Sequence, residues 1–246
     1  MANQNKKLVI SEIFGPVLQG EGALIGRPTL FVRTGGCDFR CQWCDTLYAV
    51  LPQHRADWTK MAVQTILARL DELSRGVPML VTLSGGNPAL QPLDNFICEG
   101  QARGYTFALE TQGSIARDWF SQLDYLVLSP KPPSSQMPFD ETQLHACISA
   151  AQKGNGKGQI SLKVVVFNDA DYEFARRVHL LHPQIPFYLQ VGNTFSLSAS
   201  QSDEVMRSEL LMGLEKLSER VLSDSWHNVT VLPQMHVLIH GNRRGV

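Results

Sequence analysis

Three cysteines within eight residues constrain this chain more than any other feature of its sequence. Cys37, Cys41 and Cys44 have the spacing Cys-x3-Cys-x2-Cys. Clustered thiolates form a soft site that suits zinc, copper(I) or an iron–sulfur cluster. A structural zinc site usually has four protein ligands, but the nearest histidine is His54 and the other two cysteines stand alone. We therefore interpret the three cysteines as ligands of a 4Fe–4S cluster with one iron left open, while zinc and an unligated thiol cluster remain alternatives.

Length and composition allow one domain. With 246 residues and 43% hydrophobic content, the chain can bury a core as a single domain spanning residues 1–246. This range includes a polar tail at 1–7 and a C-terminal tail at 237–246. A net charge of −1 gives no electrostatic reason to expect nucleic acid or a membrane surface as partner. Neither a signal peptide nor a transmembrane segment is predicted.

The use of cysteine predicts a compartment. Five cysteines, three of them clustered, do not resemble a disulfide framework, so we expect a reducing cytoplasm. The two solitary cysteines, Cys98 and Cys147, lie in apolar helical patterns and are expected to be buried and inert.

Short apolar segments alternate with helical patterns along the chain, and most of these segments end in polar or glycine residues. Such continuous apolar strands favour a parallel sheet, in which ligands bind at the carboxyl ends of the strands. About six such repeats are too few for an eight-stranded barrel. The expected strands are Leu8–Phe14, Thr29–Arg33, Met79–Leu83, Tyr105–Leu109, Tyr125–Leu128, Ile160–Val166, Phe187–Val191 and Val229–Leu232, with helices that include Thr59–Leu73 and Glu204–Val221.

The cysteine spacing, with Trp43 before the last cysteine, resembles that of the radical S-adenosylmethionine (SAM) superfamily. The resemblance implies an α/β fold, a partial (β/α)6 barrel, here with an N-terminal strand and loop extension. It also implies that SAM chelates the open iron through its amino and carboxylate groups. An electron, supplied by a reductant such as flavodoxin or ferredoxin, would then cleave SAM and release a 5′-deoxyadenosyl radical.

Further segments resemble the 7-carboxy-7-deazaguanine synthases. The resemblance implies the ring contraction of 6-carboxy-5,6,7,8-tetrahydropterin with loss of ammonia, on the route to queuosine, by a homodimer that uses SAM and Mg²⁺. The segments that carry it are Leu18–Gly22, Arg33, Trp43–Thr46, Ser84–Pro88, Glu110–Gly113, Ser129–Lys131 and Gln234–His236.

The same resemblance implies the roles of individual residues, none of them catalytic beyond the cluster and SAM. Cys37, Cys41 and Cys44 would hold the cluster, and Thr46 would bind Mg²⁺. SAM would lie against Trp43, Cys44, Asp45, Gly86, Ser129, Pro130 and Lys131, and the pterin against Leu18, Gln19, Gly20, Glu21, Arg33, Ser84 and His236.

Other readings remain open for these residues. Gly86 could simply belong to a strand-to-helix turn, and Arg33 and His236 could be exposed. Asn87 replaces the acidic residue that is common in this motif of the superfamily. Two alternative functions share the cysteine spacing: a glycyl-radical enzyme activase, which acts on a protein, and a non-catalytic module that binds a metal cluster.

Overall fold

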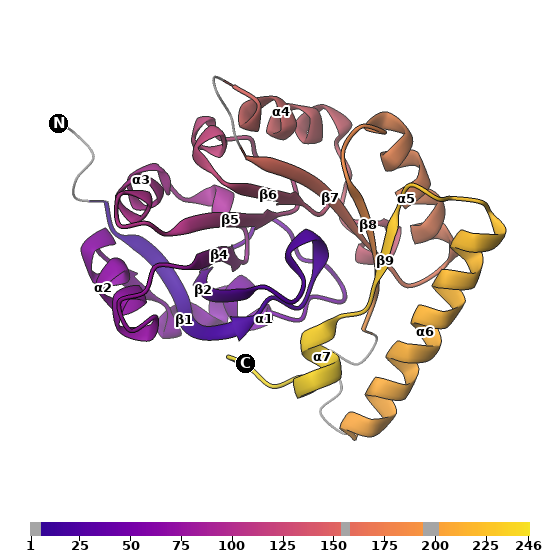
Figure 1. Cartoon of the computed structure of the whole chain (residues 1–246), viewed down its shortest axis with the longest axis horizontal. Helices are drawn as coiled ribbons and strands as arrows, with labels where there is room; N and C mark the ends of the chain where they lie inside the picture. Colours follow the sequence, from indigo (N-terminus) through magenta and orange to yellow (C-terminus); the bar gives the residue numbers. More distant parts are fainter. Residues whose placement is uncertain (1–5, 154–157, 194–201) are drawn as a thin grey trace.

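The computed structural model describes residues 6–153, 158–193 and 202–246, and it is organised around one nine-stranded sheet (Figure 1). The strand order is β3-β1-β2-β4-β5-β6-β7-β8-β9. From β2 to β9 all neighbours are parallel, whereas β1 is antiparallel to both β2 and β3. The strands are β1 (Leu8–Leu18), β2 (Pro28–Thr34), β3 (Thr59–Met61), β4 (Leu80–Gly85), β5 (Thr106–Thr111), β6 (Tyr125–Leu128), β7 (Gln159–Val166), β8 (Phe187–Val191) and β9 (Thr230–Leu232).

Helices connect the parallel strands and cover the outside of the curved sheet (Figure 1). Buried Ile66, Leu67 and Leu70 of α2 and Phe96 of α3 belong to the same hydrophobic core as the sheet residues. This arrangement and the open sheet agree with the predicted partial barrel, its N-terminal strand included. The helices are α1 (Leu47–Val50), α2 (Val63–Leu73), α3 (Asp94–Ala102), α4 (Glu141–Ala151), α5 (Asp169–Leu181), α6 (Asp203–Ser223) and α7 (Met235–His240).

The parallel register brings the strand ends together. Arg33 on β2 pairs with Ser84 on β4, and Thr34 pairs with Gly85. Since all parallel strands point the same way, the polar residues that follow them share one edge, as the sequence predicts.

Two segments differ from their predicted structure. Residues Thr59–Met61 form the edge strand β3 instead of the first turn of a helix, because their backbone pairs with Leu8–Ile10 of β1. Residues 237–240, predicted as part of a tail, belong to α7, where Val237 is buried in the core. Gly241 ends α7 with a φ of +66°, a conformation that favours glycine.

The predicted burial of the two solitary cysteines is right for one of them. Cys147 is buried, which raises its pKa to about 12, whereas Cys98 is exposed and the prediction for it is wrong. Cys98 occupies the outer face of α3, while Phe96 and Ile97 take the inner face. The predicted tail at 1–7 lies largely outside the described residues.

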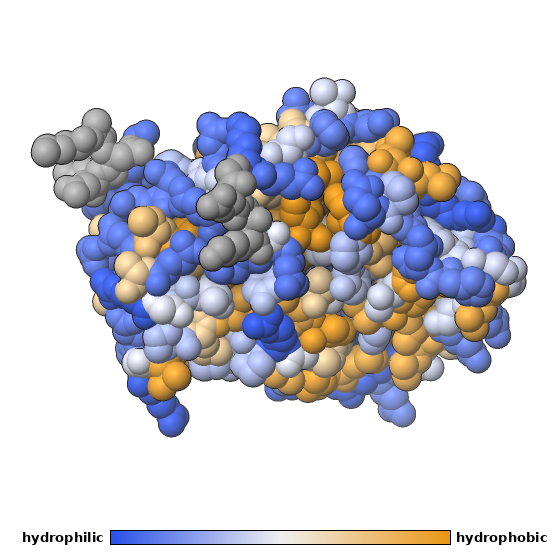
Figure 2. Space-filling model, turned by 45° about the horizontal axis from the view of Figure 1, so that its top comes forward, coloured by the Kyte–Doolittle hydropathy of each residue, from blue (hydrophilic) through white to orange (hydrophobic). Residues whose placement is uncertain are grey.

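The surface mixes hydrophilic residues with separate hydrophobic patches, as Figure 2 shows for one face. Large apolar side chains that reach solvent include Val77, Leu180 and Leu222. Among the described residues no helix combines the length and apolar character that crossing a bilayer requires.

The contact between Gly100 of α3 and Phe107 of β5 gives a test of this packing. A Cβ at position 100 would lie 2.4 Å from the Phe107 ring. Alanine normally favours a helix over glycine, but here we expect Gly100→Ala to destabilise the protein by about 1–3 kcal/mol through overpacking. Urea unfolding of Gly100→Ala, Phe107→Leu and the double variant measures this effect. The double variant should be less destabilised than the sum of the two single changes; a stabilising Gly100→Ala would contradict the packing.

Candidate active site

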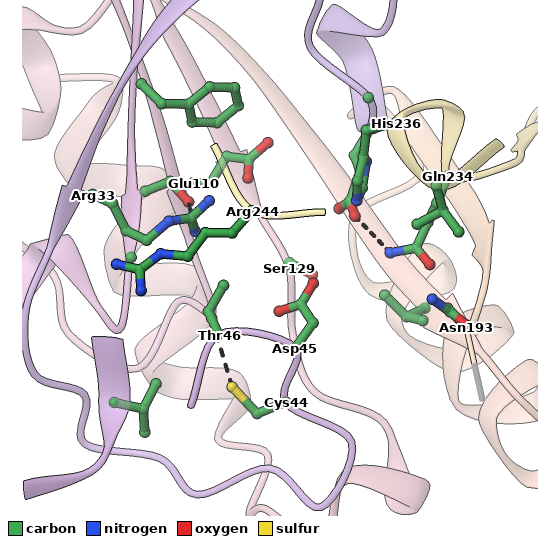
Figure 3. Close-up of a pocket in the computed structure, with 18 of the residues that line it drawn as sticks. Arg33, Cys44, Asp45, Thr46, Glu110, Ser129, Asn193, Gln234, His236 and Arg244 are labelled. Atoms are coloured by element: carbon green, nitrogen blue, oxygen red, sulfur yellow. Dashed lines mark hydrogen bonds between the residues drawn. The ribbon is translucent and has the colours of Figure 1, made fainter. Parts of the chain in front are cut away.

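A pocket of about 320 Å³ lies at the carboxyl edge of the parallel strands. Its size falls at the lower end of the range for small-molecule sites. The wall combines the cysteine loop, the ends of β1, β2, β4, β5, β6 and β7, and the segment 241–246 after α7. In Figure 3, Arg33 and Arg244 lie on one side of the pocket and Gln234 and His236 on the other, with Asp45 and Thr46 between them.

The three cysteines of the motif line this pocket together. Burial raises the pKa of all three thiols, that of Cys41 to about 11, so a metal must displace protons when it binds them. Within the described part of the chain, no three Cys, His, Asp or Glu side chains are already gathered around one metal position. The donor set of three thiols on one short loop nevertheless fits an iron–sulfur cluster.

The turn after β4 lies directly against the cysteine loop. A Cβ at Gly86 would lie 2.0 Å from the carbonyl oxygen of Gly36 and 3.0 Å from the Cβ of Cys37. Glycine is therefore required at position 86 for this close approach. The backbone N–H of Asn87 also donates to the carbonyl of Gly36, at 2.8 Å. The predicted cofactor residue Gly86 thus stands beside the predicted cluster ligands.

The remaining predicted cofactor residues converge on the same pocket, with one exception. Trp43 donates through its indole to Ser134 at 2.9 Å, and its ring lies 5.6 Å from the Lys131 ammonium. That ammonium is 3.4 Å from the Ser129 hydroxyl. Trp43, Cys44, Asp45, Gly86, Ser129 and Lys131 all line the pocket, whereas Pro130 is buried and does not.

The loop after β1 is held by its own glutamine. The side-chain oxygen of Gln19 accepts the amides of Gly20 and Glu21, at 2.7 and 3.3 Å, while its nitrogen donates to Glu110 at 2.9 Å. A Cβ at Gly20 would lie 2.2 Å from Nδ1 of His236. The predicted residues Gln19, Gly20 and Glu21 thus lie in one cluster with His236, which is more than 200 positions away in the sequence. Leu18, half-exposed at the end of β1, also lines the pocket.

A buried charge cluster follows this loop. The ammonium of Lys163 on β7, with only 5% of its side chain exposed, pairs with Glu21, which also accepts a hydrogen bond from Gln234 at 2.7 Å. Burial alone would raise the pKa of Glu21, but Lys163 and His236 outweigh it and lower the value to about 2. For Glu110, burial and the charge of Glu21 raise the pKa. The pKa values of the two carboxyl groups are therefore shifted in opposite directions. Glu21 is ionised and accepts hydrogen bonds, whereas Glu110 retains a proton more readily.

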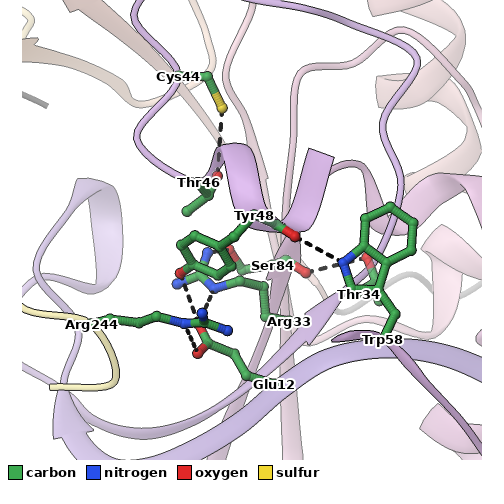
Figure 4. A network of polar contacts seen from close by, with 9 residues as sticks. All are labelled: Glu12, Arg33, Thr34, Cys44, Thr46, Tyr48, Trp58, Ser84 and Arg244. Carbon is green, nitrogen blue, oxygen red and sulfur yellow. Dashed lines mark hydrogen bonds and ion pairs between the residues drawn. The ribbon is translucent and has the colours of Figure 1, made fainter. Parts of the chain in front are cut away.

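A second polar network, centred on Glu12 of β1, surrounds Arg33 (Figure 4). Glu12 accepts hydrogen bonds from Arg33 at 2.7 Å, Tyr48 at 2.8 Å and Arg244 at 2.8 Å. Arg33 also donates to the predicted residue Ser84 at 3.3 Å, and the Arg244 guanidinium lies 3.7 Å from the centre of the Tyr48 ring. Two guanidinium groups share one carboxylate here, which leaves this side of the pocket with a net positive charge.

Thr46 lies between these networks and the cysteine loop. Its hydroxyl is 3.7 Å from the sulfur of Cys44, and both side chains face the pocket with Asp45. A hydroxyl and a carboxylate at adjacent positions are oxygen donors of the kind that Mg²⁺ prefers.

Comparison with known proteins identifies the family. No family model matches the chain. It is 44% identical over 243 residues to the 7-carboxy-7-deazaguanine synthase of Bacillus subtilis, a match that covers 98% of this chain and 99% of that protein. It is 41% identical to the Bacillus cereus enzyme of the same name, with 98% and 99% of the two chains covered. The chain belongs to the 7-carboxy-7-deazaguanine synthase family.

Solved structures agree with the fold of this synthase family. The structure of QueE from Escherichia coli matches with a TM-score of 0.67 at 19% identity, over 94% of this chain and 95% of that one. Streptococcus suis SuiB, solved with S-adenosylmethionine bound, matches with a TM-score of 0.54 at 12% identity, over 82% of this chain and 47% of that one. The chain is thus an enzyme with the fold of radical SAM proteins that acts on a small molecule, and the relatives favour neither the activase nor the non-catalytic module.

Several pocket residues of this synthase-family member were not among the predicted site residues. Lys163 lies within an apolar strand pattern, where a single lysine gives little signal, and Arg244 lies in a segment predicted as a tail. A polar residue interrupting a buried strand could have pointed to Lys163. The unpredicted residues of the lining include Tyr48, Glu110, Lys163, Gln234 and Arg244, and Glu12, outside the lining, pairs with Arg33 and Arg244.

The buried pair of Lys163 and Glu21 predicts a pH-dependent loss of stability. Glu21 has its ordinary pKa of 4.5 in the unfolded chain and about 2 in the fold, so its stabilising contribution is present above pH 4.5 and lost as the pH falls towards 2. Lys163→Met removes the main partner and should destabilise the protein by about 3–5 kcal/mol near neutral pH. The deficit should shrink near pH 4.5, where the buried carboxylates can take up protons.

Urea unfolding of Lys163→Met and wild type at both pH values checks this expectation. Lys153→Met is the matched control, because Lys153 pairs with Asp118 at 2.8 Å but both side chains are exposed. An equal, pH-independent loss of unfolding free energy in the two variants would show that the buried pair contributes no more stability than the exposed pair.

Proposed function

We propose that the chain converts 6-carboxy-5,6,7,8-tetrahydropterin into 7-carboxy-7-deazaguanine, with loss of ammonia. The observation that carries the proposal is one pocket in which three cysteines face the predicted pterin residues. Relatives named 7-carboxy-7-deazaguanine synthase over the full length support it.

Three elements would hold the cofactors. Cys37, Cys41 and Cys44 would ligate the 4Fe–4S cluster. The backbone at Gly86 would bind the amino group of SAM, and the strand end at Ser129–Lys131 with Trp43 and Asp45 would hold the rest of the cofactor. When bound, the cluster and SAM together supply the 5′-deoxyadenosyl radical that starts the reaction.

The chain's own residues would orient the pterin. Glu21 is ionised, so it can accept N–H groups of the guanine-like edge of a pterin. Arg33, steadied by Glu12 and Ser84, would bind the substrate carboxylate through its fork of N–H donors. His236 and the loop Leu18–Gly20 would close the pocket around the ring.

Thr46 would provide one oxygen ligand for Mg²⁺, with water and substrate oxygens completing the shell. Magnesium seldom has a full set of protein ligands. At this place the ion would hold the substrate carboxylate beside SAM and stabilise negative charge as the ring rearranges.

The wider setting also belongs to the proposal. Residues 1–246 would act as one domain, which the single continuous sheet supports. The absence of disulfides among the described residues supports a reducing cytoplasm, where flavodoxin or ferredoxin would supply electrons to a homodimer.

The direct test is anaerobic turnover. Protein reconstituted with iron and sulfide is incubated with dithionite, SAM and the carboxypterin, and products are read by mass spectrometry. We expect 7-carboxy-7-deazaguanine and ammonia from wild type and from Cys98→Ala, whose exposed thiol lies outside the pocket. Cys41→Ala should form no product. A wild-type protein with an intact cluster that yields no deazapurine would refute the proposed reaction.

The magnesium role of Thr46 has its own test. Thr46→Ala should keep the cluster and SAM binding but lose most of the Mg²⁺ dependence of turnover, because one ligand of a weakly held ion is gone. Rates are measured against Mg²⁺ concentration for this variant, for wild type and for Thr65→Ala, a change on the exposed face of α2. If Thr46→Ala responds to Mg²⁺ as wild type does, the assignment is wrong.

A further inference from the structure

Asp38, directly after the first cysteine, is bound by donors from two strand ends. Its Oδ1 accepts hydrogen bonds from Asn87 at 2.8 Å and Gln112 at 2.7 Å, and its Oδ2 accepts one from Ser114 at 2.6 Å. Asn87 follows β4, while Gln112 and Ser114 follow β5. Three donors on one carboxylate make a charge-assisted contact between the cysteine loop and the sheet.

The amide of Asn87 can take only one orientation in this network. Its Oδ1 accepts the backbone N–H of Ala89 at 3.1 Å and the hydroxyl of Thr111 at 2.8 Å. A backbone N–H can only donate, so the carbonyl end must face Ala89 and the NH₂ end must face Asp38. Asn87 is fully buried and does not line the pocket. Its side chain therefore serves the cysteine loop and not a ligand in the pocket.

The same network holds Cys37 on both sides. Before it, the carbonyl of Gly36 accepts a hydrogen bond from the backbone N–H of Asn87 at 2.8 Å. After it, Asp38 is fixed by its three donors, and the side-chain nitrogen of Gln112 is 3.8 Å from the Cys37 sulfur. The sulfur also accepts the backbone amide of Phe39 at 3.4 Å. Hydrogen bonds around a ligand sulfur orient it and tune the cluster it holds.

We propose that Asp38 and Asn87 form a matched acid–amide pair that positions Cys37 for cluster binding. The inference rests on the proposed cluster, but it concerns two residues that lie outside the lining of the pocket. An acidic residue at position 87 would place a buried carboxylate against the exposed carboxylate of Asp38, at the distance where the side-chain amide now donates. An acid at 38 therefore requires an amide at 87, which gives a physical reason for the asparagine in this motif.

The test begins with Asn87→Asp, which changes only the amide nitrogen to oxygen. We expect the variant to fold but to lose its reconstituted cluster to a chelator about tenfold faster than wild type, or more. The rate of cluster loss, iron and sulfide per chain, and the electron paramagnetic resonance spectrum of the reduced cluster are measured. Asn95→Asp is the matched control, since Asn95 donates to Glu99 at 2.7 Å on α3, away from the cysteine loop. It should lose the cluster at the wild-type rate.

The reciprocal double variant Asp38→Asn/Asn87→Asp tests the pairing of Asp38 with Asn87 directly. It restores one acid and one amide across the contact, so it should recover much of the cluster retention that Asn87→Asp loses. A purely structural defect would not be rescued by a second change. Wild-type retention and spectrum in Asn87→Asp, or no recovery in the double variant, would overturn the inference. If Asn87→Asp does not fold, Asp38→Ala replaces it, and unchanged cluster retention in that variant overturns the inference.

Failure of the inference and failure of the proposed function give different results. If wild type itself binds no iron, the proposed cluster is wrong. If wild type binds a cluster and all variants retain it equally, the cluster stands and the pairing of Asp38 with Asn87 does not.

Discussion

The buried ammonium of Lys163 is the interaction on which the pocket depends. It lies within β7 between apolar neighbours, and a buried charge of this kind is costly unless opposite charges surround it. Glu21 supplies that opposite charge through an ion pair. The ion pair between Lys163 and Glu21 thus fixes the loop after β1 against the sheet. That loop then presents Gly20 to His236 and its backbone carbonyl to Met235, so the last helix is placed as well.

The ionisable groups of the pocket also create an electrostatic gradient inside one small cavity. Glu21 is held ionised by Lys163, whereas burial and the nearby Glu21 favour the neutral form of Glu110. On the opposite side, Arg33 and Arg244 share Glu12. A ligand with N–H donors at one end and a carboxylate at the other would find complementary charge at both ends. This polarity fits a carboxypterin better than a neutral molecule.

Sequence patterns could predict those parts of the site that lie in short segments directly after apolar strands. The cysteine spacing, the strand ends at Gly86 and Ser129 and the loop at Gln19–Glu21 are all short segments next to apolar strands. Parallel strands bring such segments to one edge whatever the details of packing. The contact of Glu12 with Arg244 is different, because it joins residues 232 positions apart and follows from the placement of α7. The strand at Thr59–Met61 was missed for a similar reason, since its partner Leu8–Ile10, and not its own pattern, decides its conformation.

The order in which the chain is synthesised gives the Glu12–Arg244 contact a further meaning. The cysteine loop and most of the sheet precede α6, so they can pair while the end of the chain is still absent. Gln234, His236 and Arg244 arrive last and complete the pocket wall. A nascent chain therefore presents its three cysteines in a more open cavity than the finished protein does. The segment after α7 thus narrows the access to the cysteines, and the contact of Arg244 with Glu12 fastens it to the first long strand.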